Sequence, residues 1–177
     1  MALASRRIRL STIAIVASAG LVAACSAQPA AQTTSPESTP ATAEVAVHPT
    51  SGLAIIPLQV TDGHDTHSFR VELAATVGAQ AKGMMFRTEM APDEGMLFPS
   101  RTVEVRGFWM KNTPLPLDII FIGADGRIIN IAENTVPYSL ETVYSEGPAG
   151  AVLELAGGRA AELGIKPGDM VEYSLPE

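Results

Sequence analysis

The chain has a single cysteine, Cys25, among its 177 residues. One thiol excludes an internal disulfide and a cysteine-rich metal site. None of the three histidines lies near a serine in a recognisable catalytic motif, and no G-x-S-x-G segment occurs, so acyl transfer by a serine triad is not expected. The glycine-rich segment at 147–150 lacks the lysine and the following helix of a phosphate-binding loop.

Basic residues are also few. The chain has 12 Lys and Arg against 19 Asp and Glu, a formal net charge of -7. Three of the arginines, Arg6, Arg7 and Arg9, lie in a segment that we expect to be removed, which leaves 9 basic and 19 acidic residues, or -10. A surface of that charge repels phosphate backbones, and no basic stripe offsets it. Nucleic acid is therefore not an expected partner.

Residues 1–24 have the pattern of an export signal. A basic start precedes an apolar run at 13–24 that is too short to cross a bilayer. The segment 22–25, VAAC, resembles the lipobox of bacterial lipoproteins, whose cysteine is lipid-modified and becomes the new N-terminus. We expect a lipid on Cys25 to anchor an exported protein to the cell envelope, facing the periplasm or the exterior. An ordinary cleaved leader and an uncleaved anchor are the alternatives.

The remaining chain divides into a tether and one domain. Residues 25–50 are rich in Ala, Thr, Ser and Pro with little that is large and apolar, which is typical of a disordered tether. Residues 51–177 are enough for one domain with a core. We therefore expect three parts: a lipoprotein signal at 1–24, a tether that starts with the lipidated cysteine at 25–50, and a folded domain at 51–177.

Short segments with strand-like patterning dominate the domain. Thr76 as N-cap and Gly83 as break predict a short helix from 76 to about 85, and Gly164 closes a second at 158–163. We expect a mainly β, single-domain sandwich or barrel, jelly-roll-like, with one or two short helices. Residues 133–150 are predicted to form a long loop. The expected strands are 53–60, 67–73, 96–98, 103–110, 117–122, 127–132, 152–155 and 170–175.

The segment 106–122, RGFWMKNTPLPLDIIFI, holds the only tryptophan beside a polar cluster. A fixed cation, an amide and a carboxylate next to an indole would bind a small polar, anionic or hydroxylated ligand. Alternatively, these side chains hold the proline-rich corner together, with the tryptophan as core. The candidate ligand-binding residues are Arg87, Trp109, Lys111, Asn112 and Asp118.

Two other chemistries have weaker support. A hydrolase could take its acid and base from Asp93, Glu94, Glu104, Asp118 and Glu154, although these are equally explained as a capped turn and solvated strand faces. His64 and His67 with Met84, Met85, Met90, Met96 and Met110 raise a copper site, but methionines more commonly fill an irregular core. We expect no metal and no cofactor.

Five motifs together resemble the prokaryotic family known as domain of unknown function 192, over residues 55–175. That resemblance implies a mostly β, sandwich-like domain that is frequently exported and has no established biochemical activity. Met84 stands where the family pattern usually has leucine, a swap that keeps volume and polarity. The motifs are GMMFR at 83–87, DEGMLF at 93–98, FWMKNTPLPLDIIFI at 108–122, DGRI at 125–128, and VLEL at 152–155 followed by GD at 168–169.

Our leading hypothesis from the sequence is a non-catalytic small-ligand-binding or accessory module of the cell envelope. The first alternative is a hydrolase of envelope saccharides or peptides, with Asp118 and either Glu154 or Glu94 as acid and base. The second is a structural protein-interaction module, which would expose an apolar patch in place of a pocket. The sequence identifies no protein partner.

Overall fold

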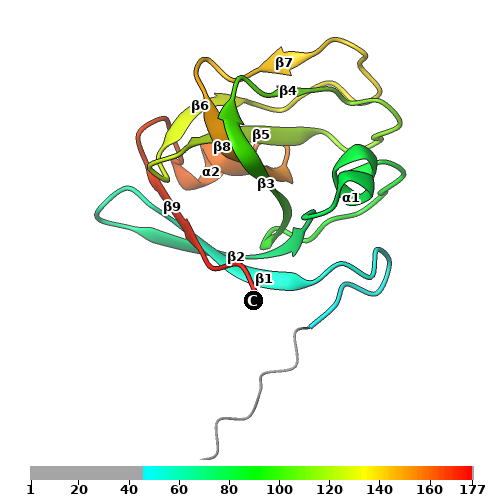
Figure 1. Ribbon diagram of the computed structural model, residues 1–177, viewed down its shortest axis with the longest axis horizontal. Helices are drawn as coiled ribbons and strands as arrows, with labels where there is room; N and C mark the ends of the chain where they lie inside the picture. Colours follow the sequence, from blue (N-terminus) through cyan, green and yellow to red (C-terminus); the bar gives the residue numbers. More distant parts are fainter. Residues whose placement is uncertain (1–45, 177) are drawn as a thin grey trace, which may run out of the picture. The chain divides into compact units, whose positions relative to one another are not determined.

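The structure, a computed structural model, describes residues 46–176 (Figure 1). The expected signal segment, Cys25 and the tether as far as residue 45 lie outside the described residues. No helix between residues 46 and 176 combines the length and the apolar character needed to cross a membrane.

The described residues form nine strands and two short helices. Most strands are joined by turns or short loops, and α1 lies in the connection between β2 and β3. The elements are β1 (Ile55–Thr61), β2 (Thr66–Leu73), α1 (Val77–Lys82), β3 (Glu94–Glu104), β4 (Gly107–Phe108), β5 (Leu117–Gly123), β6 (Ile128–Ala132), β7 (Val143–Tyr144), β8 (Ala149–Ala156), α2 (Arg159–Leu163) and β9 (Met170–Tyr173).

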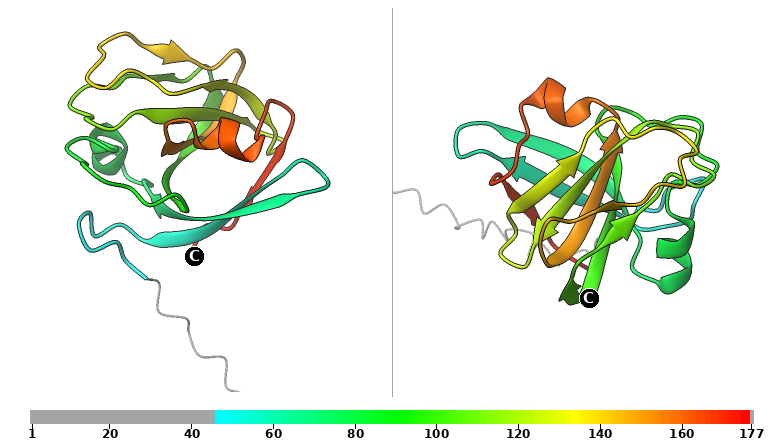
Figure 2. Two further views of the ribbon diagram at one scale, coloured as in Figure 1. Left: turned by 180° about the vertical axis from the view of Figure 1, so that it is seen from behind. Right: turned by 90° about the horizontal axis from the view of Figure 1, so that it is seen from above.

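Seven strands form one mixed sheet in the order β6-β5-β8-β3-β2-β1-β9, and β4 and β7 form a separate two-stranded ribbon. The pair β2 and β3 is parallel, which requires the crossover that contains α1. The sheet curls strongly, as the views in Figure 2 show. An isolated bridge between Arg127, just before β6, and Met170 of β9 brings the two ends of the sheet together. Within the described residues β6 and β9 are not paired as strands, so the sheet does not close into a barrel.

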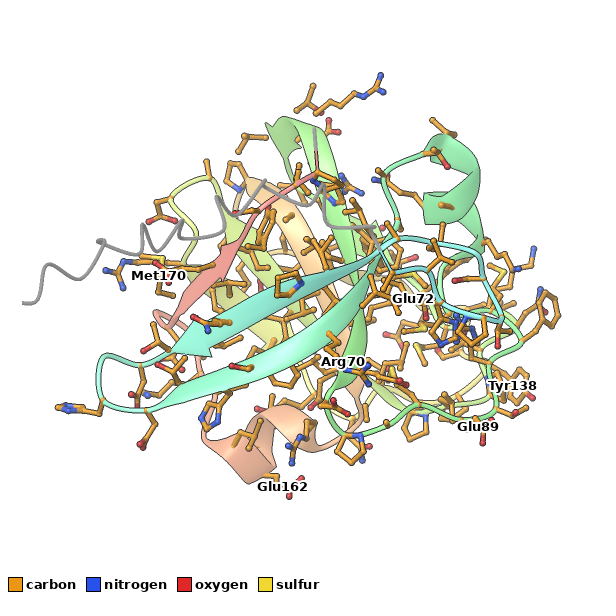
Figure 3. All side chains as sticks on the ribbon, turned by 90° about the horizontal axis from the view of Figure 1, so that it is seen from below. Arg70, Glu72, Glu89, Tyr138, Glu162 and Met170 are labelled. Atoms are coloured by element: carbon orange, nitrogen blue, oxygen red, sulfur yellow. The ribbon has the colours of Figure 1, made fainter. Side chains whose placement is uncertain are left out.

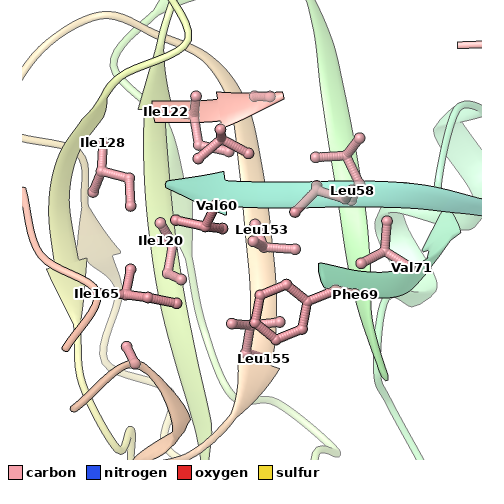
Figure 4. Close-up of a cluster of buried hydrophobic side chains, with 14 of the residues drawn as sticks. Leu58, Val60, Phe69, Val71, Ile120, Ile122, Ile128, Leu153, Leu155 and Ile165 are labelled. Atoms are coloured by element: carbon pink, nitrogen blue, oxygen red, sulfur yellow. The ribbon is translucent and has the colours of Figure 1, made fainter. Parts of the chain in front are cut away.

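Strands β5 and β8 are buried on both faces, which explains their nearly continuous apolar sequences. Alternate residues face two different cores. Ile120 and Leu153 belong to the first core, on the side of β1, β2 and β9 (Figure 4). Phe121 and Val152 belong to the second core, which also holds Phe98 of β3. The second core lies under the ribbon of β4 and β7 and carries the candidate site.

The expectation of a mainly β domain with one or two short helices is confirmed. The caps of α1 are confirmed as well: the Thr76 hydroxyl accepts a hydrogen bond from the Ala79 amide, and Gly83 ends the helix at φ 48°. α2 ends at Gly164 in the left-handed region, also as predicted.

Two expectations about strands were wrong. Residues 103–110 are not one strand, because β3 continues to Glu104 and the pairing of β3 with β8 is irregular between Pro99 and Glu104. The chain then restarts as the separate strand β4. The predicted loop at 133–150 contains β7 and the first residues of β8. Two-residue strands leave too few alternating positions to be recognised in a sequence.

Candidate functional site

Glu154 is a buried carboxyl in the middle of β8. Its chain neighbours Leu153 and Leu155 face the first core, so alternation places Glu154 on the opposite face. There it pairs across the sheet with Met96 and Ile119, both in the second core. The residue is 4% exposed, and its Oε2 has no hydrogen-bond partner in the structure. Buried polar atoms are nearly always bonded, so this oxygen requires an explanation.

Burial raises the pKa of Glu154 to about 8, because the apolar surroundings disfavour the charged form. Strands β3 and β8 lie very close together at this point, since a Cβ on Gly95 would lie 2.5 Å from the Glu154 carbonyl oxygen. At neutral pH the side chain is therefore mostly a neutral carboxylic acid. In that state it donates one hydrogen bond and accepts others.

A cavity of about 270 Å³ opens above this carboxyl, and we call it the Glu154 pocket. Its lining combines apolar, neutral polar and basic side chains, and among residues 46–176 Glu154 is the only acidic residue in it. The main lining side chains are Met84, Phe98, Phe108 and Trp109, the polar Gln80 and Thr113, and the basic Lys82 and Arg106.

Aromatic packing holds the walls of the Glu154 pocket in place. The ring of Phe108 stands edge-on to Phe98 at 5.1 Å and to Phe121 at 6.2 Å between centroids. The Arg106 guanidinium lies 5.9 Å from the Phe108 ring centroid. A Cβ on Gly107 would come within 2.8 Å of the Tyr144 ring, so glycine lets β4 lie close to β7. The short ribbon thus fixes Phe108 over the second core.

Helix α1 brings polar groups to the same pocket. The Gln80 side chain donates a hydrogen bond of 2.8 Å to the Pro99 carbonyl, which ties α1 to β3. Lys82 follows in the last turn of α1. Met84 comes directly after the helix break and is buried in the second core.

Trp109 and Lys111 lie together, as the sequence hypothesis required of a site. Trp109 lines the Glu154 pocket and is 47% exposed. The Lys111 ammonium lies 5.2 Å from the centroid of its ring, within the range of a cation–π contact. The tryptophan is therefore a half-exposed wall of the pocket and not a core residue.

Asn112 joins the KNT turn to the GMMFR segment. Its φ of 56° is one that asparagine tolerates, and its carbonyl accepts a hydrogen bond of 2.7 Å from the Phe86 amide. Its side-chain amide lies 3.9 Å from the sulfur of Met85. Asn112 thereby holds Met85, which also lines the Glu154 pocket, next to the tryptophan segment.

Asp118 lies on the other face of the sheet. It is fully buried, and its carboxylate accepts three backbone hydrogen bonds: 2.7 Å from Asn134, 2.9 Å from Gly158 and 2.7 Å from Ala160. These bonds attach the loop after β6 and the start of α2 to β5. Asp118 and Glu154 therefore do not converge on one cleft, and Asp118 holds the fold together at α2.

Arg87 lies in a separate buried ion pair. Its Nη2 is 2.6 Å from both carboxylate oxygens of Glu72 on β2. Figure 3 labels Glu72, and also Arg70 of the same strand. Ser51 donates a further hydrogen bond to Glu72. His48, in a segment that the sequence assigns to the tether, lies 3.3 Å from the guanidinium. Arg87 lines its own cavity of about 480 Å³, so the structure does not bring it to Trp109.

We predict that Arg87→Met lowers the free energy of unfolding by about 3 kcal/mol, because it leaves the Glu72 carboxylate buried without its cation. Urea unfolding measures the loss. The double variant Glu72→Gln/Arg87→Met is the control and should regain most of it. If the double variant is as unstable as the single one, the ion pair does not account for the effect.

The other candidates are dispersed. Glu94 lines the cavity of Arg87 and accepts a hydrogen bond from the Ala91 amide. His64 and His67 belong to the hairpin of β1 and β2, whereas Met96 and Met110 fill the second core. No cluster of three His, Cys, Asp or Glu side chains suited to a metal ion occurs between residues 46 and 176.

Sequence reasoning missed most of the pocket. It named Glu154 only as one possible partner of Asp118, and it did not select Gln80, Lys82, Arg106 or Phe108. The usable signal was a lone acid inside the apolar VLEL segment, since such a residue on a strand buried on both faces has nowhere to be solvated.

Comparisons with solved structures include two similar chains. A protein of unknown function from Novosphingobium aromaticivorans DSM 12444 is 55% identical with a TM-score of 0.71, over 74% of this chain and 94% of its own. A Sinorhizobium meliloti 1021 protein described as a "putative transcription regulator" is 43% identical with a TM-score of 0.66, over 68% of this chain and 95% of its own. None of the curated proteins compared matches the chain.

The family comparison agrees with the sequence motifs. The model of DUF192, described as "Uncharacterized ACR", matches residues 58–173, which is more than half of the chain. This range includes β8 with Glu154, the aromatic walls and the KNT turn. The chain therefore belongs to the DUF192 family.

Proposed function

We propose that this domain is a non-catalytic binding module that takes a small organic ligand into the Glu154 pocket. One observation carries the proposal: a carboxyl oxygen without a hydrogen-bond partner in a residue that lines the cavity. An unsatisfied buried polar atom costs about 1–3 kcal/mol, and a ligand that bonds to it recovers that free energy. The ligand would therefore complete the hydrogen bonding of the domain.

The shape and lining of the cavity support this function. Ligand pockets are concave and mostly apolar, with a few polar groups that fix orientation. The Glu154 pocket has this composition, and its volume of about 270 Å³ lies just below the usual range. A small molecule fits it better than a polymer segment.

Paired-carboxylate hydrolysis has less support. It needs a second carboxyl within about 5 to 9 Å of the first, on the other side of the bond that is cleaved. Within the described part of the chain, Glu154 has no acidic companion in the lining of its pocket. Asp118 faces α2, and Glu94 lines the cavity of Arg87.

A protein-interaction role is the second candidate, and one observation favours it. Phe86 and Tyr138 flank the KNT turn, bonded through their amides to the carbonyls of Asn112 and Thr113. Both have φ above 60° and are 70% and 62% exposed. Strained backbone conformations cluster at functional sites, and aromatic residues are enriched at protein interfaces.

Ligand binding predicts a rise in the unfolding midpoint with the correct class of compound. A ligand at 100-fold its dissociation constant adds about 2.7 kcal/mol, which moves the midpoint by several degrees. Thermal unfolding of the chain should be measured with envelope sugars, peptides, organic acids, amines and metal ions. We expect at least one class of organic compound to raise the midpoint by more than 3 °C, a threshold of roughly 1 kcal/mol.

Matched variants show whether a hit depends on the wall formed by Trp109, which lines the Glu154 pocket and also a neighbouring cavity of about 240 Å³. Trp109→Ala removes a lining side chain and should abolish the shift. Tyr138→Ala removes another exposed aromatic residue that is not part of the lining, and should preserve it. A shift that survives in Trp109→Ala would place the ligand elsewhere. A complete screen without a hit would contradict the proposed function and favour the protein-interaction role.

We also propose that the domain faces the outside of the cytoplasmic membrane, attached through a lipid on Cys25. The VAAC segment supports this location. Cys25→Ser should release the protein from membranes into the soluble fraction, because the diacylated thiol is lost. Fractionation with immunoblotting measures the change, and Ser26→Ala serves as the control. Unchanged membrane association of Cys25→Ser would reject lipidation.

A further inference from the structure

We propose that the ligand of the Glu154 pocket is a small organic acid. Its anionic end lies at the rim beside Lys82 and Arg106, and an acceptor at its inner end takes a hydrogen bond from the Glu154 carboxyl. This inference rests on the proposed function and specifies the class of ligand. The charges around the cavity, the depth of Glu154 and the apolar walls carry it.

The rim of the pocket is basic in a chain whose net charge is -7. Lys82 and Arg106 line the cavity, and Lys111 lies on the ring of Trp109 at its side. Within residues 46–176, no acidic side chain forms an ion pair with any of these three cations. By contrast, the exposed Arg70 pairs with two carboxylates on the surface. Three cations without counter-ions beside one cavity attract an anion.

The Arg106 guanidinium retains donors for such an anion. It donates to the Ser100 hydroxyl and lies over the Phe108 ring, and these contacts fix its position. A guanidinium carries five N–H donors, and a carboxylate is its natural bidentate partner. Lys82, in the last turn of the exposed helix α1, adds a mobile ammonium.

The floor of the pocket, unlike its rim, favours an uncharged group of the ligand. Glu154 is 4% exposed and surrounded by Met96, Phe98 and Ile119. A charged ligand group placed against it would therefore lose its hydration at a high free-energy cost. Desolvation keeps the carboxyl mostly protonated at pH 7. A neutral carboxyl donates a hydrogen bond to a carbonyl, ether or hydroxyl oxygen. The inner end of the ligand is therefore a neutral acceptor.

An amine fits this distribution poorly. It would have to pass the unpaired rim cations Lys82 and Arg106, and then ionise a carboxyl that burial holds neutral. An apolar body between the two ends matches the side chains of Met84, Phe98 and Phe108. The pocket thus distinguishes an amphiphilic acid from a sugar, which would lack a charge, and from a cation.

Four compounds of nearly equal size test the class. 4-Acetylbenzoate carries both the anion and the inner acceptor. In 4-acetylbenzamide a neutral amide replaces the anion, and in 4-(aminomethyl)acetophenone a cation replaces it. 4-Isopropylbenzoate keeps the anion but lacks the acceptor. The readout is the indole ¹H–¹⁵N signal of the full chain, which is single because Trp109 is the only tryptophan. We expect 4-acetylbenzoate to bind at least tenfold more tightly than each of the other three.

Charge variants locate the anion. Lys82→Met and Arg106→Met should each weaken 4-acetylbenzoate at least fivefold more than they weaken 4-acetylbenzamide, since only the carboxylate loses its cation. Arg101→Met is the matched control, because Arg101 is exposed and does not line the Glu154 pocket. Glu154→Leu should remove the advantage of 4-acetylbenzoate over 4-isopropylbenzoate.

The outcomes separate this inference from the function it rests on. Preferred binding of the amine, or equal binding of the anion and the amide, overturns the organic-acid class and leaves a binding pocket. If no compound moves the indole signal, the organic-acid class is overturned as well, and the wider thermal screen decides the proposed function. Only the anion preference together with the loss in the two rim variants supports the inference.

Discussion

Glu154→Gln is expected to stabilise the domain by roughly 4 kcal/mol more at pH 8 than at pH 4. The folded chain holds the proton of Glu154 up to a pKa of about 8, whereas the unfolded chain releases it near 4.5. Between these values the unfolded state binds fewer protons, so the stability of the native chain falls as pH rises. Glutamine does not ionise in either state. The difference between the two chains therefore grows across this window by about 1.4 kcal/mol per pH unit.

Urea unfolding of both chains at pH 4, 6 and 8 measures this difference. Subtracting the value at pH 4 cancels any constant free-energy cost of a buried amide. Glu172→Gln is the matched control, because Glu172 is exposed on β9 and solvated in the folded and unfolded chains alike. A Glu154→Gln difference that stays constant with pH would show that Glu154 is not buried in the neutral form.

Asp118→Asn is expected to lower the free energy of unfolding by about 4 kcal/mol. The Asp118 carboxylate uses Oδ1 for the amides of Asn134 and Gly158 and Oδ2 for the amide of Ala160. Hydrogen bonds to a charged group contribute about 1.5–3 kcal/mol each. Asparagine offers one oxygen, so its NH₂ group must face a backbone N–H donor. At least one buried amide then loses its partner and α2 loses its attachment to β5.

Chemical unfolding at neutral pH gives the magnitude, and Asp65→Asn is the control. Asp65 is exposed in the turn between β1 and β2, so the same substitution there should change stability by less than about 0.5 kcal/mol. A loss below about 1 kcal/mol for Asp118→Asn would contradict the structural role. It would also reopen Asp118 as a residue retained for ligand binding.

Much of the fold follows from local sequence signals. The alternation around Phe69 and Val71 predicts β2, and the caps at Thr76 and Gly83 predict α1. These signals act within a few residues, so a single sequence contains them. The parallel pairing of β2 with β3 and the division into two cores depend on contacts between distant segments, and no local pattern encodes them.

In the candidate site, too, some features follow from local sequence and others depend on contacts between distant segments. Trp109 and Lys111 are adjacent in sequence and remain together in the structure. Asp118 is only a few residues further on, yet its strand turns it to the other face of the sheet. Arg87 pairs with Glu72, a partner 15 residues away that the motif does not include. Proximity in a motif therefore did not predict proximity in space.

Glu154 was the hardest residue to interpret from sequence. An acidic residue within a strand is usually interpreted as lying on a solvent-exposed face, because many strands expose one side. Only the observation that β8 lies between β3 and β5, with cores on both sides, turns that acid into a buried group. The pocket above it is assembled from α1, β3, β4 and the tryptophan segment, all of which lie well before Glu154 in the chain.

The proposed function depends on Glu154 being a buried carboxyl whose Oε2 has no hydrogen-bond partner among residues 46–176. A ¹³C NMR titration of the glutamate carboxyl carbons tests it most directly, with the Glu154 signal assigned by its loss in Glu154→Gln. We predict a titration midpoint near pH 8 for this carboxyl. A midpoint close to the ordinary 4.5 would show that the carboxyl is solvated or already paired, and would contradict the claim.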